Sequence, residues 1–256
     1  MMDNKCRIGI DVGGTFTDIV AVSDTGTVTF SKAASTPNDQ SIGVMDAVER
    51  LADELGINSE TLLSKTESIV HGTTVATNAL LERKGAKTGL LTTLGHRDVL
   101  EMREGLKDDR YNMRLPAPAP LVPRFLRLGV RERIKPDGSI HTKLDNTSLD
   151  EAINKLREEK VTSVAVCYLH AYKEPKHEQE TKQILEAKLP GVSVSISSEV
   201  FPEIKEYERV STTIVNAYVR PIVENYLNRL EERLKNAGYK GSVSVSYTHL
   251  TLPTSL

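Results

Sequence analysis

The first part of the chain alternates apolar and polar residues with a period of two. Residues 7–12 and 16–23 alternate in this way on either side of two adjacent glycines, and a turn at 23–26 leads into a third such stretch at 27–33. Alternation of this kind, bounded by turn residues, is typical of half-buried strands. The pattern therefore predicts an antiparallel meander of three strands.

Beyond the meander the apolar period changes to that of a helix. Ile42, Met45, Ala52 and Leu55 share one helical face, and Gly56 follows where a helix would end. We therefore expect an amphipathic helix that packs this face against the meander.

Strands and helices then alternate. Residues 68–74 predict a short strand that runs into a turn, residues 75–84 a helix with Gly85 at its C-cap, and residues 87–93 another strand. Helices between buried strands indicate a mixed sheet covered by helices.

The second half of the chain predicts another α/β unit. A proline-rich stretch at 108–123 without periodicity is either a linker or an ordered loop. The elements expected after it are a hairpin around residues 136–138, a helix with a capping box at Ser148 and Glu151, a strand at 161–169, a helix from Pro175, a strand at 191–197, and a long helix that Pro221 interrupts and Gly238 ends.

Composition excludes several classes of partner. The chain has 256 residues, 39% of them hydrophobic and 27% charged, with a net charge of −2. This balance provides no electrostatic footprint for nucleic acid or an anionic membrane surface, and neither a signal peptide nor a membrane-spanning run is apparent. Cys6 and Cys167 lie far apart and suit a reducing compartment, so a cytoplasmic location is expected.

The glycine pair between the first two strands carries an unusual set of polar residues. Gly13 and Gly14 would let backbone amides approach an anion and adopt positive φ, while Thr15 and Thr17 add hydroxyl donors. Asp11, at the end of the first strand, is placed to hold a hydrated Mg²⁺ beside a phosphate. The spacing fits neither a Walker loop nor a dinucleotide fingerprint. A tight hairpin with incidental threonines is the alternative.

A second group of polar residues surrounds the next strand end. Thr73 and Thr74 precede a helix, where free amides can bind an anion or where a threonine simply caps the helix. Asn78 follows one turn later, and from the residues alone the cap is the favoured interpretation. His71 is either a core residue or a general acid or base. Asp18 either contributes to the phosphate site or faces solvent.

Several longer stretches resemble a known family. "GIDVGGTFTD", "HGTTVATNALLERKGAKTGLLTT", "GHRDVLEMRE", "LPAPAPLVPR" and "SSEVFPEIKEYERVSTTIVNAYV" occur in the order typical of A-type subunits of the hydantoinase/oxoprolinase family, within the actin, Hsp70 and sugar-kinase ATPase superfamily. The resemblance implies an α/β fold: an actin-like (ribonuclease H-like) N-terminal lobe with a mixed sheet, plus a second α/β unit.

The resemblance also implies an activity. A cyclic amide such as 5-oxoproline or a hydantoin would be activated by phosphorylation from ATP, with Asp11 linked to Mg²⁺ and with Gly13, Gly14, Thr15, Thr17 and Asp18 at the phosphates. The resemblance makes Thr73, Thr74 and Asn78 candidates for lining the substrate cleft. Arg103 is a further candidate for substrate contact, or a surface ion-pair residue. A B-type partner subunit or domain is expected. The alternatives are a small-molecule kinase of the same superfamily, one component of a ketone carboxylase, and a non-catalytic regulatory module.

The expected organisation follows from these elements. Residues 5–123 would form the actin-like lobe, 124–200 the second α/β unit, and 201–245 the helical start of the next region. Residues 246–256 resemble translated adapter sequence and are expected to be a non-native tail, or else a truncated strand. No second Gly-Gly-Thr hairpin follows Gly14, so the C-terminal lobe is expected to be absent and the chain alone inactive.

Overall fold

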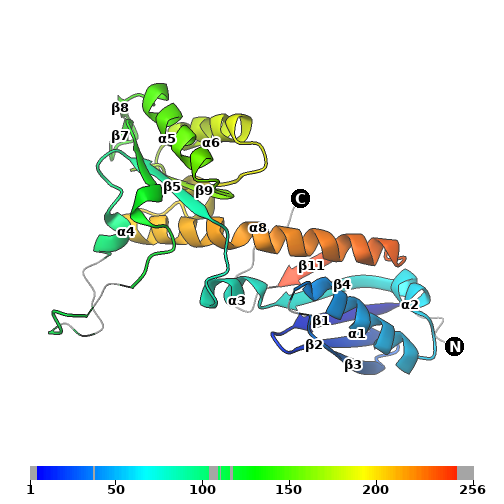
Figure 1. The fold of residues 1–256 in the computed structure, drawn as a ribbon. Coiled ribbons are helices and arrows are strands. Elements are labelled where there is room, and N and C mark those ends of the chain that lie inside the picture. The colour runs from blue at the N-terminus through cyan, green and yellow to red at the C-terminus, as the bar shows by residue number, and fades with distance from the viewer. Residues whose placement is uncertain (1–4, 37, 104–108, 110, 116–117, 247–256) are drawn as a thin grey trace. The chain divides into compact units, whose positions relative to one another are not determined.

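The structure, a computed structural model, describes residues 5–36, 38–103, 109, 111–115 and 118–246. Two compact units emerge (Figure 1): unit 1 contains residues up to Glu82 and from Ile222 onward, and unit 2 contains Arg83–Pro221. These boundaries differ from the expected divisions at 123 and 200, because β5 (Thr88–Thr93) pairs with strands of unit 2. The expected tail at 247–256 lies outside the described residues.

Unit 1 is built on a five-stranded mixed sheet in the order β11-β4-β1-β2-β3. β1 (Cys6–Val12), β2 (Phe16–Ser23) and β3 (Val28–Ala34) form the predicted antiparallel meander. β4 (Thr66–Thr73) pairs parallel to β1, and β11 (Val243–Ser246) pairs parallel to β4. This topology confirms the predicted ribonuclease H-like lobe.

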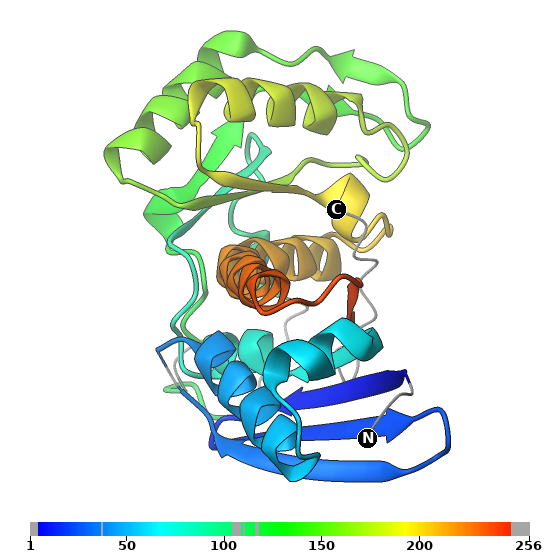
Figure 2. The same cartoon turned by 90° about the vertical axis from the view of Figure 1, so that its right-hand side faces the viewer.

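One face of this sheet carries the core of unit 1. Ile8, Ile10 and Val12 of β1 pack with α1 (Gln40–Glu54), α2 (Ser59–Lys65) and the second half of α8 (Glu206–Asn236). Figure 2 shows α1 and α2 on the same side of the strands. The opposite face carries exposed apolar side chains: Phe16, Val22, Val28, Phe30 and Val70.

The buried face of α1 is shifted from the predicted one: Ala52 is buried, and Met45 and Leu55 are partly buried, as expected. Val44, Ala47, Val48 and Leu51 are fully buried, whereas Ile42 is 39% exposed. The helix lies close to β3 at Gly43, where an added Cβ would be 3.0 Å from the Ala34 carbonyl oxygen. Backbone proximity therefore selects the face of α1 that is buried.

Unit 2 contains a four-stranded parallel sheet in the order β10-β9-β5-β6. Its other strands are β6 (Arg127–Val130), β9 (Ser163–Cys167) and β10 (Ser193–Ile196), and its longer helices are α5 (Asn146–Glu158), α6 (Lys176–Lys188) and the first half of α8. Shorter elements are α4 (Val99–Met102), the 3-10 helix Arg124–Leu126 and α7 (Ser197–Val200). β7 (Arg133–Ile134) and β8 (Ile140–Thr142) form the predicted hairpin, but β6 joins the parallel sheet.

Two helix ends differ from the sequence-based expectations. α3 (Val75–Leu81) ends at a Glu82 cap, whereas Gly85 instead leaves room for the Tyr218 ring, which would lie 2.0 Å from an added Cβ. Asp145, and not Ser148, is the N-cap of α5, and its side chain accepts from the Ser148 amide at 3.2 Å. The predicted long helix is present: α8 has 31 residues and contains Pro221.

Charged groups at the carboxyl end of the unit 2 sheet are buried and hydrogen-bonded. The Glu178 carboxylate, 0% exposed, accepts from the Tyr168 amide at 2.9 Å, the Ser197 hydroxyl at 2.6 Å and the Ser198 amide at 2.8 Å. One side chain of α6 thus ties the ends of β9 and β10 to each other.

Glu178→Gln should lower the free energy of unfolding by about 2–3 kcal/mol, because an amide NH₂ would replace an acceptor opposite buried donors. Glu186→Gln is the matched control, since Glu186 is exposed on the same helix. Urea unfolding measures both. A cost for Glu178→Gln equal to that of the control would contradict the structural role of Glu178.

Candidate phosphate-binding site

The two glycines form the tip of a β-hairpin. Val12 and Thr17 are the last paired residues of β1 and β2, and the Gly13 amide donates to the Phe16 carbonyl at 3.0 Å across the turn. Neither glycine adopts positive φ, contrary to the expectation. Close approach of the backbone favours glycine at position 13 instead, because an added Cβ would lie 3.2 Å from the Phe16 carbonyl oxygen.

The next two amides are free. Gly14 and Thr15 are both exposed, and no described residue accepts a hydrogen bond from either amide. The Gly13 amide is used inside the turn, so the donors directed outward are those of Gly14 and Thr15, with the Thr15 hydroxyl beside them. Consecutive free amides of this kind form an anion-binding concavity.

Thr17 lies inside the hairpin. Its side chain is 0% exposed, and its hydroxyl lies 3.2 Å from the Ser35 hydroxyl. Ser35 Oγ in turn donates to the Gly13 carbonyl at 2.8 Å, and the Ser35 amide donates to the Thr15 carbonyl at 2.9 Å. Thr17 and Ser35 therefore stabilise the loop from within. Sequence reasoning missed Ser35, whose one signal is its place directly after the third strand.

Asp11 projects from the end of β1 beside Gly72 of β4. The two residues are register partners, and a Cβ at Gly72 would lie 3.4 Å from Asp11 Oδ1. Asp11 is exposed, and with Gly72 it lines a surface hollow of ≈ 1050 Å³ on the open face of the sheet. Asp18, the antiparallel partner of Asp11, lines the same hollow and forms an ion pair of 3.0 Å with Lys32.

The start of α3 closes the other side of the hairpin. Thr73 Oγ1 accepts from the Val75 amide at 3.2 Å, whereas Thr74, the N-cap residue of α3, makes no side-chain cap hydrogen bond. Thr74 Oγ1 donates to the Val12 carbonyl at 3.2 Å and accepts from Asn78 Nδ2 at 3.1 Å. Asn78 Nδ2 lies 3.8 Å from where a Gly14 Cβ would be. Thr74 and Asn78 are thus brought to the glycine tip.

His71 lies on the opposite, buried face of β4, and Arg103 belongs to unit 2. His71 is on the core face of β4, is 0% exposed, and forms a 2.8 Å hydrogen bond between its Nε2 and the Tyr226 hydroxyl. Burial lowers the pKa of His71 to about 4, so the ring is neutral at pH 7. These observations favour the core role for His71. Arg103 follows α4 in unit 2.

The described residues contain no group of three or more His, Cys, Asp or Glu side chains arranged to hold a metal ion. Magnesium at a nucleotide does not require such a group, because it is bound by one or two carboxylates together with water and phosphate oxygens.

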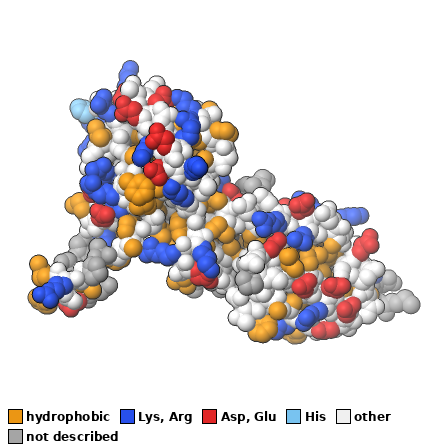
Figure 3. Space-filling view, in the orientation of Figure 1, with side chains coloured by type: hydrophobic (Ala, Val, Ile, Leu, Met, Phe, Trp, Pro, Cys, Tyr) orange, Lys and Arg blue, Asp and Glu red, His pale blue; other side chains and the backbone are white. Residues whose placement is uncertain are grey.

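No helix among the described residues is long and apolar enough to cross a membrane. On the face drawn in Figure 3, acidic and basic side chains are interspersed.

The fold and the hairpin define a ribonuclease H-like lobe of the type found in actin-like ATPases. The family model described as "Hydantoinase/oxoprolinase N-terminal region" matches residues 7–189. The chain therefore belongs to the hydantoinase/oxoprolinase family.

Individual relatives agree with this assignment. The chain is 41% identical to the alpha subunit of caprolactamase from Pseudomonas jessenii over 93% of its own length and 34% of the relative. It is 36% identical to the gamma subunit of acetophenone carboxylase from Aromatoleum aromaticum, over 92% of its length and 34% of that relative. The chain thus spans about a third of the length of these relatives.

Two solved structures share the fold. The crystal structure of ATP-dependent caprolactamase from Pseudomonas jessenii superposes with a TM-score of 0.85 at 40% identity, over 94% of this chain and 35% of that one. A nucleotide-free structure of acetone carboxylase superposes with a TM-score of 0.84 at 27% identity, over 94% of this chain and 36% of that one.

The buried His71 should make unit 1 sensitive to acid. Its pKa is about 4 in the folded chain and 6.5 when unfolded. The unfolded state therefore binds the proton first, and stability falls as the pH decreases from 6.5 to 4. The contribution of this group amounts to about 3 kcal/mol.

His71→Gln keeps an acceptor for Tyr226 and should remove this part of the pH dependence. The measurement is urea unfolding at several pH values between 4 and 7. His141→Gln, at an exposed position of β8, should retain the wild-type pH profile. Parallel profiles for wild type and His71→Gln would contradict the assignment.

Proposed function

We propose that this chain is the N-terminal portion of an ATP-dependent hydrolase of cyclic amides, and that the β1–β2 hairpin binds the nucleotide phosphates. The observation that supports this most directly is the pair of free amides at Gly14 and Thr15 beside the exposed Asp11 carboxylate. The family assignment supports the reaction class, because a caprolactamase acts on a cyclic amide.

The residues fit a phosphate with a bound magnesium ion. Amide donors and the Thr15 hydroxyl suit phosphate oxygens, and an exposed carboxylate oxygen is a hard ligand of the type Mg²⁺ prefers. Gly72 leaves space next to Asp11 that a Cβ would partly fill. Mg-ATP, when bound, would supply the phosphoryl group that converts an amide oxygen into a better leaving group.

The chain's own residues would act by positioning and by electrostatics. Gly14 and Thr15 would orient the phosphate oxygens, while the internal bonds of Thr17 and Ser35 keep the loop in one shape. Thr74 ties the start of α3 to β1, and this bond fixes the distance between Asn78 and the glycine tip. Such preorganised donors need no rearrangement when charge develops on the transferring group.

A role as one component of a ketone carboxylase is the second candidate function. The similarity to the acetophenone carboxylase sequence and to the acetone carboxylase structure supports it. The same hairpin would serve both chemistries, because a ketone oxygen can also be activated by phosphorylation. In either case we propose a B-type partner subunit, since the relatives named here are themselves subunits.

Asp11→Asn tests the role of the carboxylate. In the full-length enzyme, substrate-dependent ADP release should fall about 100-fold or more in kcat, because single electrostatic groups at the reacting phosphate contribute a few kcal/mol. The free energy of unfolding should change little, since Asp11 is exposed.

Asp24→Asn is the matched control for Asp11→Asn. Asp24 is also exposed but lies in the turn at the opposite end of β2. Turnover of the Asp24→Asn enzyme should remain at the wild-type level. Wild-type turnover in Asp11→Asn would remove Asp11 from the mechanism.

Activity of the full-length enzyme with cyclic amides and not with ketones would separate the two candidate functions. For the 256-residue chain alone we expect weak Mg-ATP binding and no turnover.

Ser35→Ala tests the internal support of the loop. Loss of the hydroxyl leaves the Gly13 carbonyl without its donor, so KM for ATP in the full-length enzyme should rise about tenfold, as expected for a lost hydrogen bond of about 1.4 kcal/mol. Ser23→Ala is the control, because Ser23 supports the β2–β3 turn through Thr25 and Thr27. An equal KM in both variants would contradict the proposed role of Ser35.

A further inference from the structure

The carboxyl end of the unit 2 sheet is a place where its strand connections diverge. β5 and β9 are adjacent in the sheet. From β5 the chain continues to β6, on one side of this pair, whereas from β9 it continues to β10, on the opposite side. Loops that leave adjacent parallel strands in opposite directions open a crevice, and α/β proteins bind ligands at such points. His96 follows β5 at this edge, and His170 follows β9.

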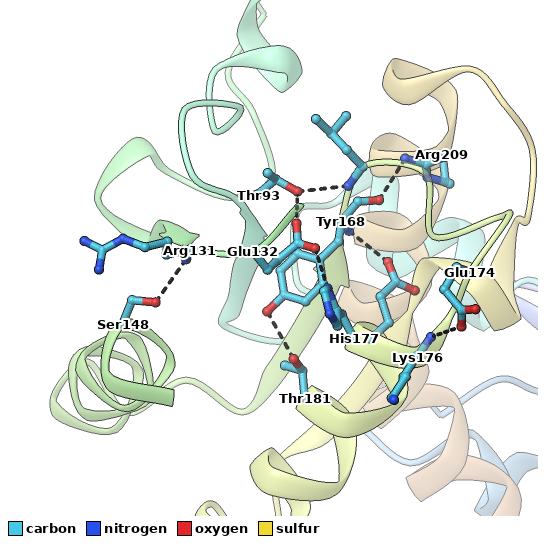
Figure 4. Close-up of polar contacts among 12 residues, drawn as sticks. Thr93, Arg131, Glu132, Ser148, Tyr168, Glu174, Lys176, His177, Thr181 and Arg209 are labelled. Atoms are coloured by element: carbon cyan, nitrogen blue, oxygen red, sulfur yellow. Dashed lines mark hydrogen bonds and ion pairs between the residues drawn. The ribbon is translucent and has the colours of Figure 1, made fainter. Parts of the chain in front are cut away.

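A buried polar network fixes the frame of this edge (Figure 4). Thr93 Oγ1 donates to one oxygen of Glu132 and accepts from the Leu169 amide at 2.9 Å. The other oxygen of Glu132 lies 2.8 Å from His177 Nδ1, and both side chains are 3% exposed or less. Because Glu132 is held inward, the next residue, Arg133, is directed toward His96.

Most side-chain N–H groups of Arg133 have no acceptor among the described residues. One of its terminal nitrogens lies 3.0 Å from His96 Nε2, and its side chain is half-buried. No carboxylate of the described residues forms an ion pair with it. Arg127 and Arg209, the buried arginines of unit 2, instead contact a carboxylate or carbonyl groups. An arginine fork with most of its N–H groups unused is suited to a planar anion.

His96 is neutral and is oriented by Arg133. A guanidinium can only donate, so His96 Nε2 accepts, and the ring proton resides on Nδ1. Burial and the charge of Arg133 both lower the pKa of His96, and the charge of His170 acts in the same direction. His170 is held by a 3.3 Å contact between its Nδ1 and the Tyr172 hydroxyl, and its backbone has φ 59°. Its Nε2 remains for a further partner.

We propose that Arg133, His96 and His170 form a binding site for a small carboxylate. The fork of Arg133 and the Nδ1 proton of His96 offer two kinds of donor to a group with two oxygens in one plane. The negative charges of Glu132 and Glu206, which act on His96, favour a monoanion over a phosphate dianion. The site lies within unit 2 and does not depend on nucleotide binding by the hairpin.

The test is histidine side-chain NMR on the 256-residue chain, titrated with sodium acetate against sodium chloride at constant ionic strength. Acetate should shift the His96 and His170 signals saturably, in about the millimolar range expected for a ligand of about four heavy atoms. His141, which is exposed on β8, should not respond. Phosphate should bind more weakly than acetate.

Arg133→Gln should weaken acetate binding at least tenfold. Arg131→Gln is the matched control: Arg131 is two residues away, exposed and paired with Asp145, so binding should stay within twofold of wild type. If Arg133→Gln does not give a folded spectrum, Arg133→Lys retains the charge without the fork and should weaken binding at least threefold. A linear response to acetate, tighter binding of phosphate, or unchanged binding in the Arg133 variants would overturn the proposal.

Discussion

The parallel pairing of β1 with β4 is the interaction on which the candidate site depends. Its register places Asp11 beside Gly72 and Val12 beside Thr73, and the Thr74 hydroxyl then bonds back to the Val12 carbonyl. A shift of one residue would exchange the faces of β4. His71 would leave the core, and a residue larger than glycine would lie next to the Asp11 carboxylate. The apolar core beneath the sheet thus determines the geometry of polar groups above it.

In the glycine hairpin, some backbone amides and carbonyls form hydrogen bonds within the protein, whereas other amides have no acceptor among the described residues. The Gly13 amide and the carbonyls of Gly13 and Thr15 are satisfied by Phe16 and Ser35 within the protein. Gly14 and Thr15 are exposed, and their amides have no acceptor among the described residues. A loop whose shape is fixed by its own carbonyls loses little entropy when an anion binds to its amides. This division explains why Thr17, despite its hydroxyl, is buried.

The sequence was informative wherever a local pattern determined the structure. Alternation predicted the meander, and the Gly13–Gly14 pair between two strands predicted the hairpin tip, because both depend on neighbours in the chain. The buried face of α1 was not predictable in this way, since it depends on how near the helix lies to Ala34. Ser35 was missed, and Gly85 was wrongly predicted to be a C-cap, for the same reason: each is explained by a residue distant in sequence, Gly13 in one case and Tyr218 in the other.

The largest departure from the expected organisation is that unit 1 is discontinuous. All of unit 2 lies between Glu82 and Ile222, and the chain then returns to unit 1 through the second half of α8 and β11. Sequence patterns could not show this return, because composition does not change at either junction. The entropy of closing a loop grows only with the logarithm of its length, so each doubling costs about 0.6 kcal/mol more. A compact unit fixes the span between its own ends and lowers that cost further. Tyr226, Leu230 and Leu234 of α8 are then buried in the apolar core of unit 1, which offsets the cost of closing the insertion.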